Sequence, residues 1–137
     1  VLYKVGTARS AHEILKSQNL DIISGQSIKK IDLLKSLVRP MASAIKNGEI
    51  QLMGDILSES WSIKSSLSKE VTNAEINSIC KEFDEMKGIY GYKLLGAGGG
   101  GYLLLVGENS VIKNLKLKGL TYFELENNGS KVIFNDN

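Results

Sequence analysis

Five glycines fall within six consecutive positions, 96–101, in the segment KLLGAGGGGYLLLVG. Each glycine gives up more conformational freedom on folding than alanine would, at a cost of about 0.5–1 kcal/mol. The apolar run that follows, YLLLV at 102–106, predicts a buried strand rather than a helix. The segment therefore requires a fold in which two apolar strands are joined by backbone that no side chain obstructs.

Two common glycine-rich phosphate loops do not fit this segment. Gly96, Gly98 and Gly101 satisfy the pattern G-x-G-x-x-G, but a dinucleotide site needs a helix after the glycines, and here a strand follows. No Lys-Ser or Lys-Thr pair follows either, which excludes a Walker A loop. Two interpretations remain. The glycines either make a tight turn, or they line a concave surface of N–H groups that approaches a phosphate or another loop. Their number favours the second.

The remaining sequence predicts an α+β domain, in which an antiparallel sheet packs on helices. We expect a strand at 1–6, helices at 8–18, 27–48, 49–67 and 72–88, strands on both sides of the glycines, a helix at 109–119 and a hairpin at 121–134. Pro40 is expected to kink the second helix or to start a new one. Thr72 and Glu75 have the spacing of a capping box, and Gly88 is expected to end the same helix.

Composition excludes several classes of function. A net charge of +2 without a dense basic cluster argues against a nucleic-acid partner, and no apolar run is long enough to cross a membrane. Cys80 is the only cysteine, so no internal disulfide is expected and a reducing, cytoplasmic location is predicted. We expect Cys80 in the core and His12, the only histidine, on the surface. No cluster of metal ligands is evident, so no metal site is expected in this chain.

A few polar residues are candidates for binding. Lys64 continues the helical stripe of Met53, Leu57 and Trp61, so its ammonium either reaches solvent at the helix end or faces an anion in a cleft. Trp61 is expected in the core or in a cleft wall. Thr7 and Arg9 stand where a strand gives way to a helix. Thr7 is either a helix cap or a binding residue, and Arg9 is either solvated or a bidentate phosphate ligand.

The segment LLGAGGGGYLLLV resembles the C-terminal motif of the GHMP kinases, the superfamily of galactokinase, homoserine kinase and mevalonate kinase. The similarity extends to LYKVGTARSAHEIL at the start, to SWSIKSSLS and VTNAEINSI in the middle, and to FELENNGSKVI at the end. It thus covers nearly the whole chain. Within the superfamily, the sequence is most similar to the D-glycero-D-manno-heptose 7-phosphate kinases.

This resemblance implies that the chain is the ferredoxin-like C-terminal domain of a two-domain kinase. The phosphate loop and the catalytic aspartate would belong to an N-terminal ATP-binding domain, which is absent from this chain, so no catalytic residue is expected here. The resemblance places the ATP end of the cleft at Gly96, Ala97, Gly98, Gly99, Gly100 and Gly101, and a sugar-phosphate contact at Lys64. ATP and Mg²⁺ would be held mainly by the missing domain.

The implied reaction is phosphorylation of a heptose 7-phosphate at its anomeric hydroxyl. The expected partners are the sugar phosphate and the chain's own N-terminal domain, and self-association is possible through the surface that domain would cover. The isolated chain is expected to be inactive. The alternative is a stand-alone regulatory or ligand-binding module with a ferredoxin-like sheet and no catalysis, and sequence upstream of Val1 would discriminate between the two.

Overall fold

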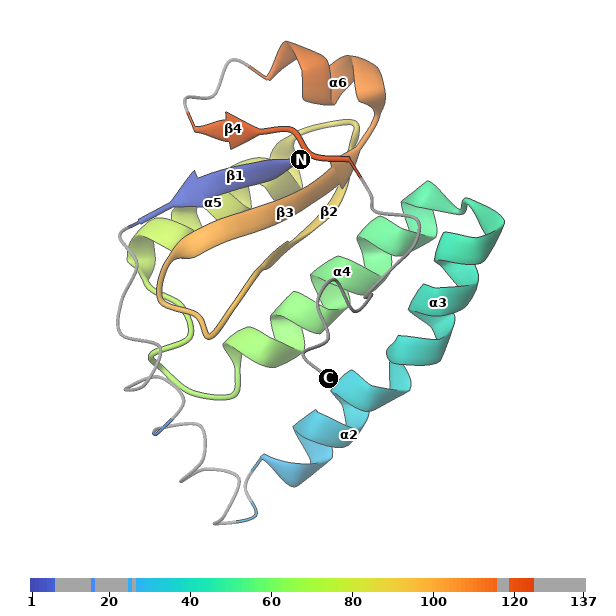
Figure 1. The fold of residues 1–137 in the computed structure, drawn as a ribbon. Helices are drawn as coiled ribbons and strands as arrows, with labels where there is room; N and C mark the ends of the chain where they lie inside the picture. Colours follow the sequence, from blue (N-terminus) through green and yellow to red (C-terminus); the bar gives the residue numbers. More distant parts are fainter. Residues whose placement is uncertain (7–15, 17–24, 26, 116–118, 125–137) are drawn as a thin grey trace, which may run out of the picture.

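The computed structural model describes residues 1–6, 16, 25, 27–115 and 119–124 (Figure 1). Four strands form one antiparallel sheet: β1 (Leu2–Val5), β2 (Ile89–Leu94), β3 (Gly101–Gly107) and β4 (Leu120–Thr121). Their order across the sheet is β2-β3-β1-β4. With helices between β1 and β2 and between β3 and β4, this is the ferredoxin-like arrangement, which confirms the predicted α+β class.

The helices are α2 (Ile28–Ser36), α3 (Val38–Asn47), α4 (Ile50–Ser65), α5 (Ala74–Glu85) and α6 (Asn109–Asn114). The segment predicted as one helix at 27–48 is two, which meet at Leu37. Pro40 is the third residue of α3, in the first turn, where a backbone N–H has no acceptor within the helix, so the missing N–H of proline costs nothing. Of the two predicted alternatives, a kink or the start of a new helix, the structure shows the second. The predicted helix at 8–18, apart from residue 16, and the hairpin beyond residue 124 lie outside the described residues.

The predicted ends of α5 are both wrong. Its N-cap is Asn73, whose Oδ1 accepts a hydrogen bond from the N–H of Ile76 at 2.9 Å. The Thr72 hydroxyl instead donates to Asn77 Oδ1 at 2.6 Å. The helix ends at Glu85, and Gly88 adopts its positive φ of 91° in the turn that leads to β2. A capping box at Thr72 is therefore replaced by an asparagine cap one residue later.

One face of the sheet packs on α5, which lies behind the strands in Figure 1. Phe83 of α5 contacts the ring of Tyr3 edge-on, with centroids 5.7 Å apart, and Leu94 and Leu103 are fully buried. Cys80 is buried here, as predicted. The core is made of Val5, Trp61, Val71, Ile76, Cys80, Phe83, Tyr92, Leu94, Leu103, Leu105 and Ile112.

Helix α4 runs alongside β2, one of the two edge strands of the sheet (Figure 1). Two glycines allow the close approach: a Cβ added to Gly91 would lie 1.9 Å from the carbonyl oxygen of Gly54, and one added to Gly54 would lie 2.5 Å from the Cβ of Tyr90. The Ser58 hydroxyl then accepts a hydrogen bond from the backbone N–H of Tyr92 at 3.2 Å. The helix therefore covers an edge whose N–H groups would otherwise be open to another strand.

Candidate functional site

The glycine loop, residues 95–100, connects β2 to β3 at one end of the sheet. Gly96, Gly98 and Gly99 have φ values of 74°, 125° and 72°, in the left-handed region that side chains disfavour. The Leu95 N–H donates to the carbonyl of Tyr102 at 2.9 Å and closes the base of the loop. Because β3 begins at Gly101, the predicted strand after the glycines is confirmed, where a dinucleotide site needs a helix.

The middle of the loop packs against the segment between α4 and α5. The Gly99 N–H donates to the carbonyl of Val71 at 2.8 Å, and the Asn73 amide donates to the carbonyl of Gly99 at 3.2 Å. A Cβ on Gly98 would lie 2.7 Å from both the Cα and the carbonyl oxygen of Val71. Gly98 is therefore glycine because another loop approaches it. The interpretation favoured from the sequence is an approach to a phosphate or to another loop, and at Gly98 the neighbour is another loop.

The two ends of the glycine stretch have no such neighbour. A Cβ on Gly96 or on Gly101 would meet no atom within 4 Å, although both residues have positive φ values. Gly96 is exposed, whereas Gly98 and Gly99 are buried. The end of β1 lies nearby, since a Cβ on Gly6 would be 3.8 Å from the Cα of Gly100. The loop thus presents open backbone on one side and is anchored on the other.

Lys64, in the last turn of α4, holds the start of the glycine loop, as Val71 and Asn73 hold its middle. Its ammonium donates to the carbonyl of Leu94 at 3.2 Å and to the carbonyl of Gly96. Burial, together with the nearby charge of Lys93, lowers the pKa of Lys64 to about 8. Two of the three ammonium donors are thereby used on the start of the glycine loop, and one remains.

The other predicted binding residues are placed differently. Trp61 is 5% exposed and belongs to the hydrophobic core, which is the first of the two positions expected for it. Thr7, Arg9 and His12 lie outside the described residues. Of the two predicted substrate residues that the structure describes, Lys64 hydrogen-bonds to the glycine loop and Trp61 packs in the core. The contact of Lys64 to a sugar phosphate stays a prediction.

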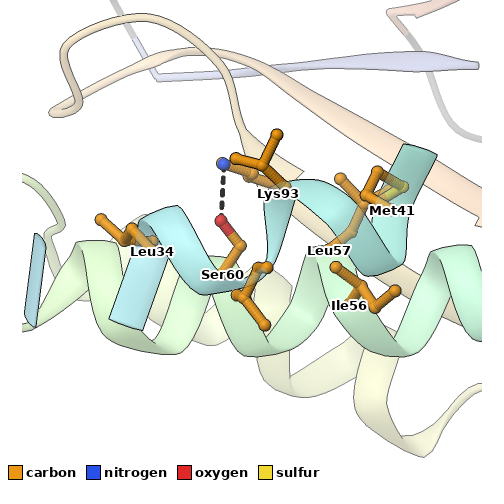
Figure 2. A pocket seen from close by; sticks show the side chains of 8 residues that line it. Leu34, Met41, Ile56, Leu57, Ser60 and Lys93 are labelled. Atoms are coloured by element: carbon orange, nitrogen blue, oxygen red, sulfur yellow. Dashed lines mark hydrogen bonds between the residues drawn. The ribbon is translucent and has the colours of Figure 1, made fainter. Parts of the chain in front are cut away.

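Sequence reasoning missed two polar residues, one that holds the glycine loop and one in the strand that precedes it. Asn73 caps α5 and holds the glycine loop at once, a double role that no local pattern reveals. Lys93 of β2 donates to the hydroxyl of Ser60 at 2.6 Å (Figure 2). The available signal was its position, a charged residue inside the apolar run of a predicted strand. Burial lowers the pKa of Lys93.

The described residues include no group of three or more His, Cys, Asp or Glu side chains that could hold a metal ion. No helix in the described part of the chain has the length and apolarity that a membrane span requires.

Residues 41–118, more than half of the chain, match the family described as "GHMP kinases C terminal". The chain is 30% identical over 107 residues to "Bifunctional fucokinase/GDP-fucose pyrophosphorylase" of Arabidopsis thaliana, a match covering 77% of this chain and 10% of that protein. It is 27% identical over 111 residues to "L-fucokinase/L-fucose-1-P guanylyltransferase" of Bacteroides fragilis, covering 80% and 12%. The chain thus spans about a tenth of the curated relatives it matches.

The fold is similar to that of L. major mevalonate kinase, whose crystal structure is a complex with R-mevalonate. The TM-score is 0.66 and the identity 21%, with 86% of this chain and 37% of that chain covered. At that identity the likeness concerns the fold alone. Together with the family match over residues 41–118, it shows that the chain belongs to the family of GHMP kinase C-terminal domains.

Proposed function

We propose that the protein containing this chain is an ATP-dependent kinase that phosphorylates the anomeric hydroxyl of a sugar. The chain would form the wall of the cleft beside the ATP phosphates. Family membership supports a kinase, and the matched relatives are named as fucokinases. The sequence resemblance to heptose 7-phosphate kinases implies phosphorylation at position 1 of a sugar. The name "L-fucose-1-P" refers to the same position, so the anomeric hydroxyl is the acceptor that both have in common.

The observation that carries this proposal is a difference within the glycine stretch, residues 96–101: its middle glycines pack against another segment, and its end glycines leave their backbone open. Gly98 packs on Val71 and Gly99 donates its N–H to the Val71 carbonyl, whereas Gly96 and Gly101, whose positive φ values also favour glycine, have no atom within 4 Å of where a Cβ would stand. Backbone of that kind can approach a phosphate closely, since no Cβ stands in the way. ATP, when bound, supplies the phosphoryl group that is transferred.

Lys64 has a positioning role in this proposal. Its two hydrogen bonds to Leu94 and Gly96 fix the start of the glycine loop, and its third donor and its charge are available to a phosphate. Phosphoryl transfer depends mainly on positioning and on stabilisation of charge, which is what an anchored loop and an ammonium provide. The catalytic base would come from the N-terminal domain that the family resemblance implies.

The proposal is tested by incubating the full-length protein with Mg²⁺-ATP and a panel of acceptors. We expect a sugar 1-phosphate, detected by phosphorus NMR, from L-fucose or from D-glycero-D-manno-heptose 7-phosphate. The matching 1,5-anhydro sugars lack the anomeric hydroxyl and should give no product. The 137-residue chain alone should be inactive with every acceptor.

Two outcomes would contradict the proposal. Phosphoryl transfer to a 1,5-anhydro sugar would show that another hydroxyl is the acceptor. The absence of transfer to any sugar, in a full-length protein that binds ATP, would remove the kinase assignment and favour the non-catalytic module. Mevalonate is included because a relative of similar fold binds it, and a product from mevalonate alone would replace the sugar by that acceptor.

A further inference from the structure

A second cavity lies away from the glycine loop, between α4 and the pair formed by α2 and α3. Its volume is about 250 Å³ and it opens to solvent. Leu34, Met41, Ile56 and Leu57 form apolar walls, and Lys93 of β2 stands opposite them (Figure 2). The lining comes from three consecutive helices and from the distant strand β2, so the cavity is a product of the tertiary fold.

The polar end of this cavity carries an ammonium that pairs with no carboxylate among the described residues. Lys93 donates to the Ser60 hydroxyl, and Ser60 itself is only 7% exposed. Among the described residues, the structure shows an ion pair between Lys35 and Asp32. No carboxylate of those residues lies within ion-pair distance of Lys93. Burial without an acidic partner lowers the pKa of Lys93. A partly buried cation beside apolar walls is costly unless an anion joins it.

We propose that this cavity binds a small amphiphilic carboxylate, whose anionic end pairs with Lys93 and Ser60 and whose apolar body contacts Met41 and Leu57. The size follows from the volume: at about 30 Å³ for each water-sized group, a cavity of about 250 Å³ holds roughly eight non-hydrogen atoms. Hexanoate matches this size and charge. The site is independent of the proposed kinase reaction, because none of the residues that line the cavity belongs to the glycine loop. It is assigned by charge and shape alone.

Methionine-methyl NMR of the full-length protein provides the test, with hexanoate and 1-hexanol as probes at pH 7. We expect the Met41 methyl signal to shift and saturate with hexanoate, while Met53 and Met86, which do not line this cavity, stay in place. Hexanol, which lacks the charge, should bind about tenfold more weakly or worse, since a hydrogen bond to a charged group is lost. The same loss is expected for hexanoate binding to Lys93→Met.

Lys46→Met, which removes one exposed lysine from the end of α3, should bind hexanoate like the wild type. If Lys93→Met does not fold, Lys93→Gln keeps a polar side chain and serves the same purpose. Equal affinity for hexanoate and hexanol would overturn the anionic part of the proposal, as would unchanged affinity in the Lys93 variant. A Met41 signal that responds to neither probe would overturn the site itself. None of these results affects the kinase proposal.

Discussion

Replacing Gly91 by alanine is expected to reduce the free energy of unfolding by about 3 kcal/mol or more, because the added Cβ would overlap the backbone of α4. The Cβ would lie 1.9 Å from the carbonyl oxygen of Gly54 and 2.7 Å from the Ser58 hydroxyl. Backbone atoms of a packed helix cannot move aside as a flexible side chain can. Urea unfolding of the 137-residue chain, followed by the fluorescence of Trp61, its only tryptophan, measures the change.

Gly48→Ala is the matched control for this change. Gly48 also has a special conformation, with φ of 69° after α3, but its Cβ would meet nothing within 4 Å. Its expected cost is about 1–2 kcal/mol, from backbone strain alone. If the two variants were equally stable, the contact between α4 and β2 would not be as close as the structure has it.

Replacing Lys64 by methionine is expected to lower kcat/KM of the full-length protein in the proposed kinase reaction by about 10- to 100-fold, as the loss of charge-assisted hydrogen bonds of about 1.5–3 kcal/mol implies. The variant keeps the apolar stem but frees the carbonyls of Leu94 and Gly96 at the start of the glycine loop. Stability should change by less than about 1 kcal/mol, since this charge is partly exposed and water can replace it. Steady-state kinetics and a thermal melt measure both quantities.

The kinetic constants also discriminate between two roles for Lys64. A rise in KM for ATP indicates that Lys64 acts through the glycine loop, whereas weaker binding of a phosphorylated sugar, but not of its unphosphorylated analogue, indicates a direct contact to the sugar phosphate. Lys69→Met removes an exposed lysine from the segment after α4 and should leave both constants unchanged. Unchanged constants in Lys64→Met itself would remove Lys64 from the site.

Much of the fold was predictable from local patterns. The strand after the glycines, the apolar face of α5 and the restart of a helix near Pro40 all follow from spacing and from backbone chemistry. The α+β class follows from the order of the elements, and the family resemblance adds the ferredoxin-like sheet. The predicted importance of the glycine stretch is supported at Gly98, where the backbone of Val71 approaches closely.

The features that sequence reasoning missed depend on contacts between distant segments. Gly54 and Gly91 are 37 positions apart, so neither one reveals that the other lies against it. Thr72 and Asn73 are both good N-cap residues, and the contact of Asn73 with Gly99 favours the second of them. Lys93 stands out in the sequence as a charge within an apolar run, but the cavity beside it forms only when the helices α2, α3 and α4 are assembled.

The central claim is that the open side of the glycine loop faces the ATP phosphates, and hydrogen exchange of the full-length protein measures this most directly. The peptide covering residues 95–101 is followed in the free protein, with Mg²⁺-ATP and with adenosine, which lacks the phosphates. We predict that ATP slows exchange of amides in this peptide and that adenosine does not. If saturating ATP protected other parts of the protein but left this peptide unchanged, the glycine loop would not be part of the nucleotide site.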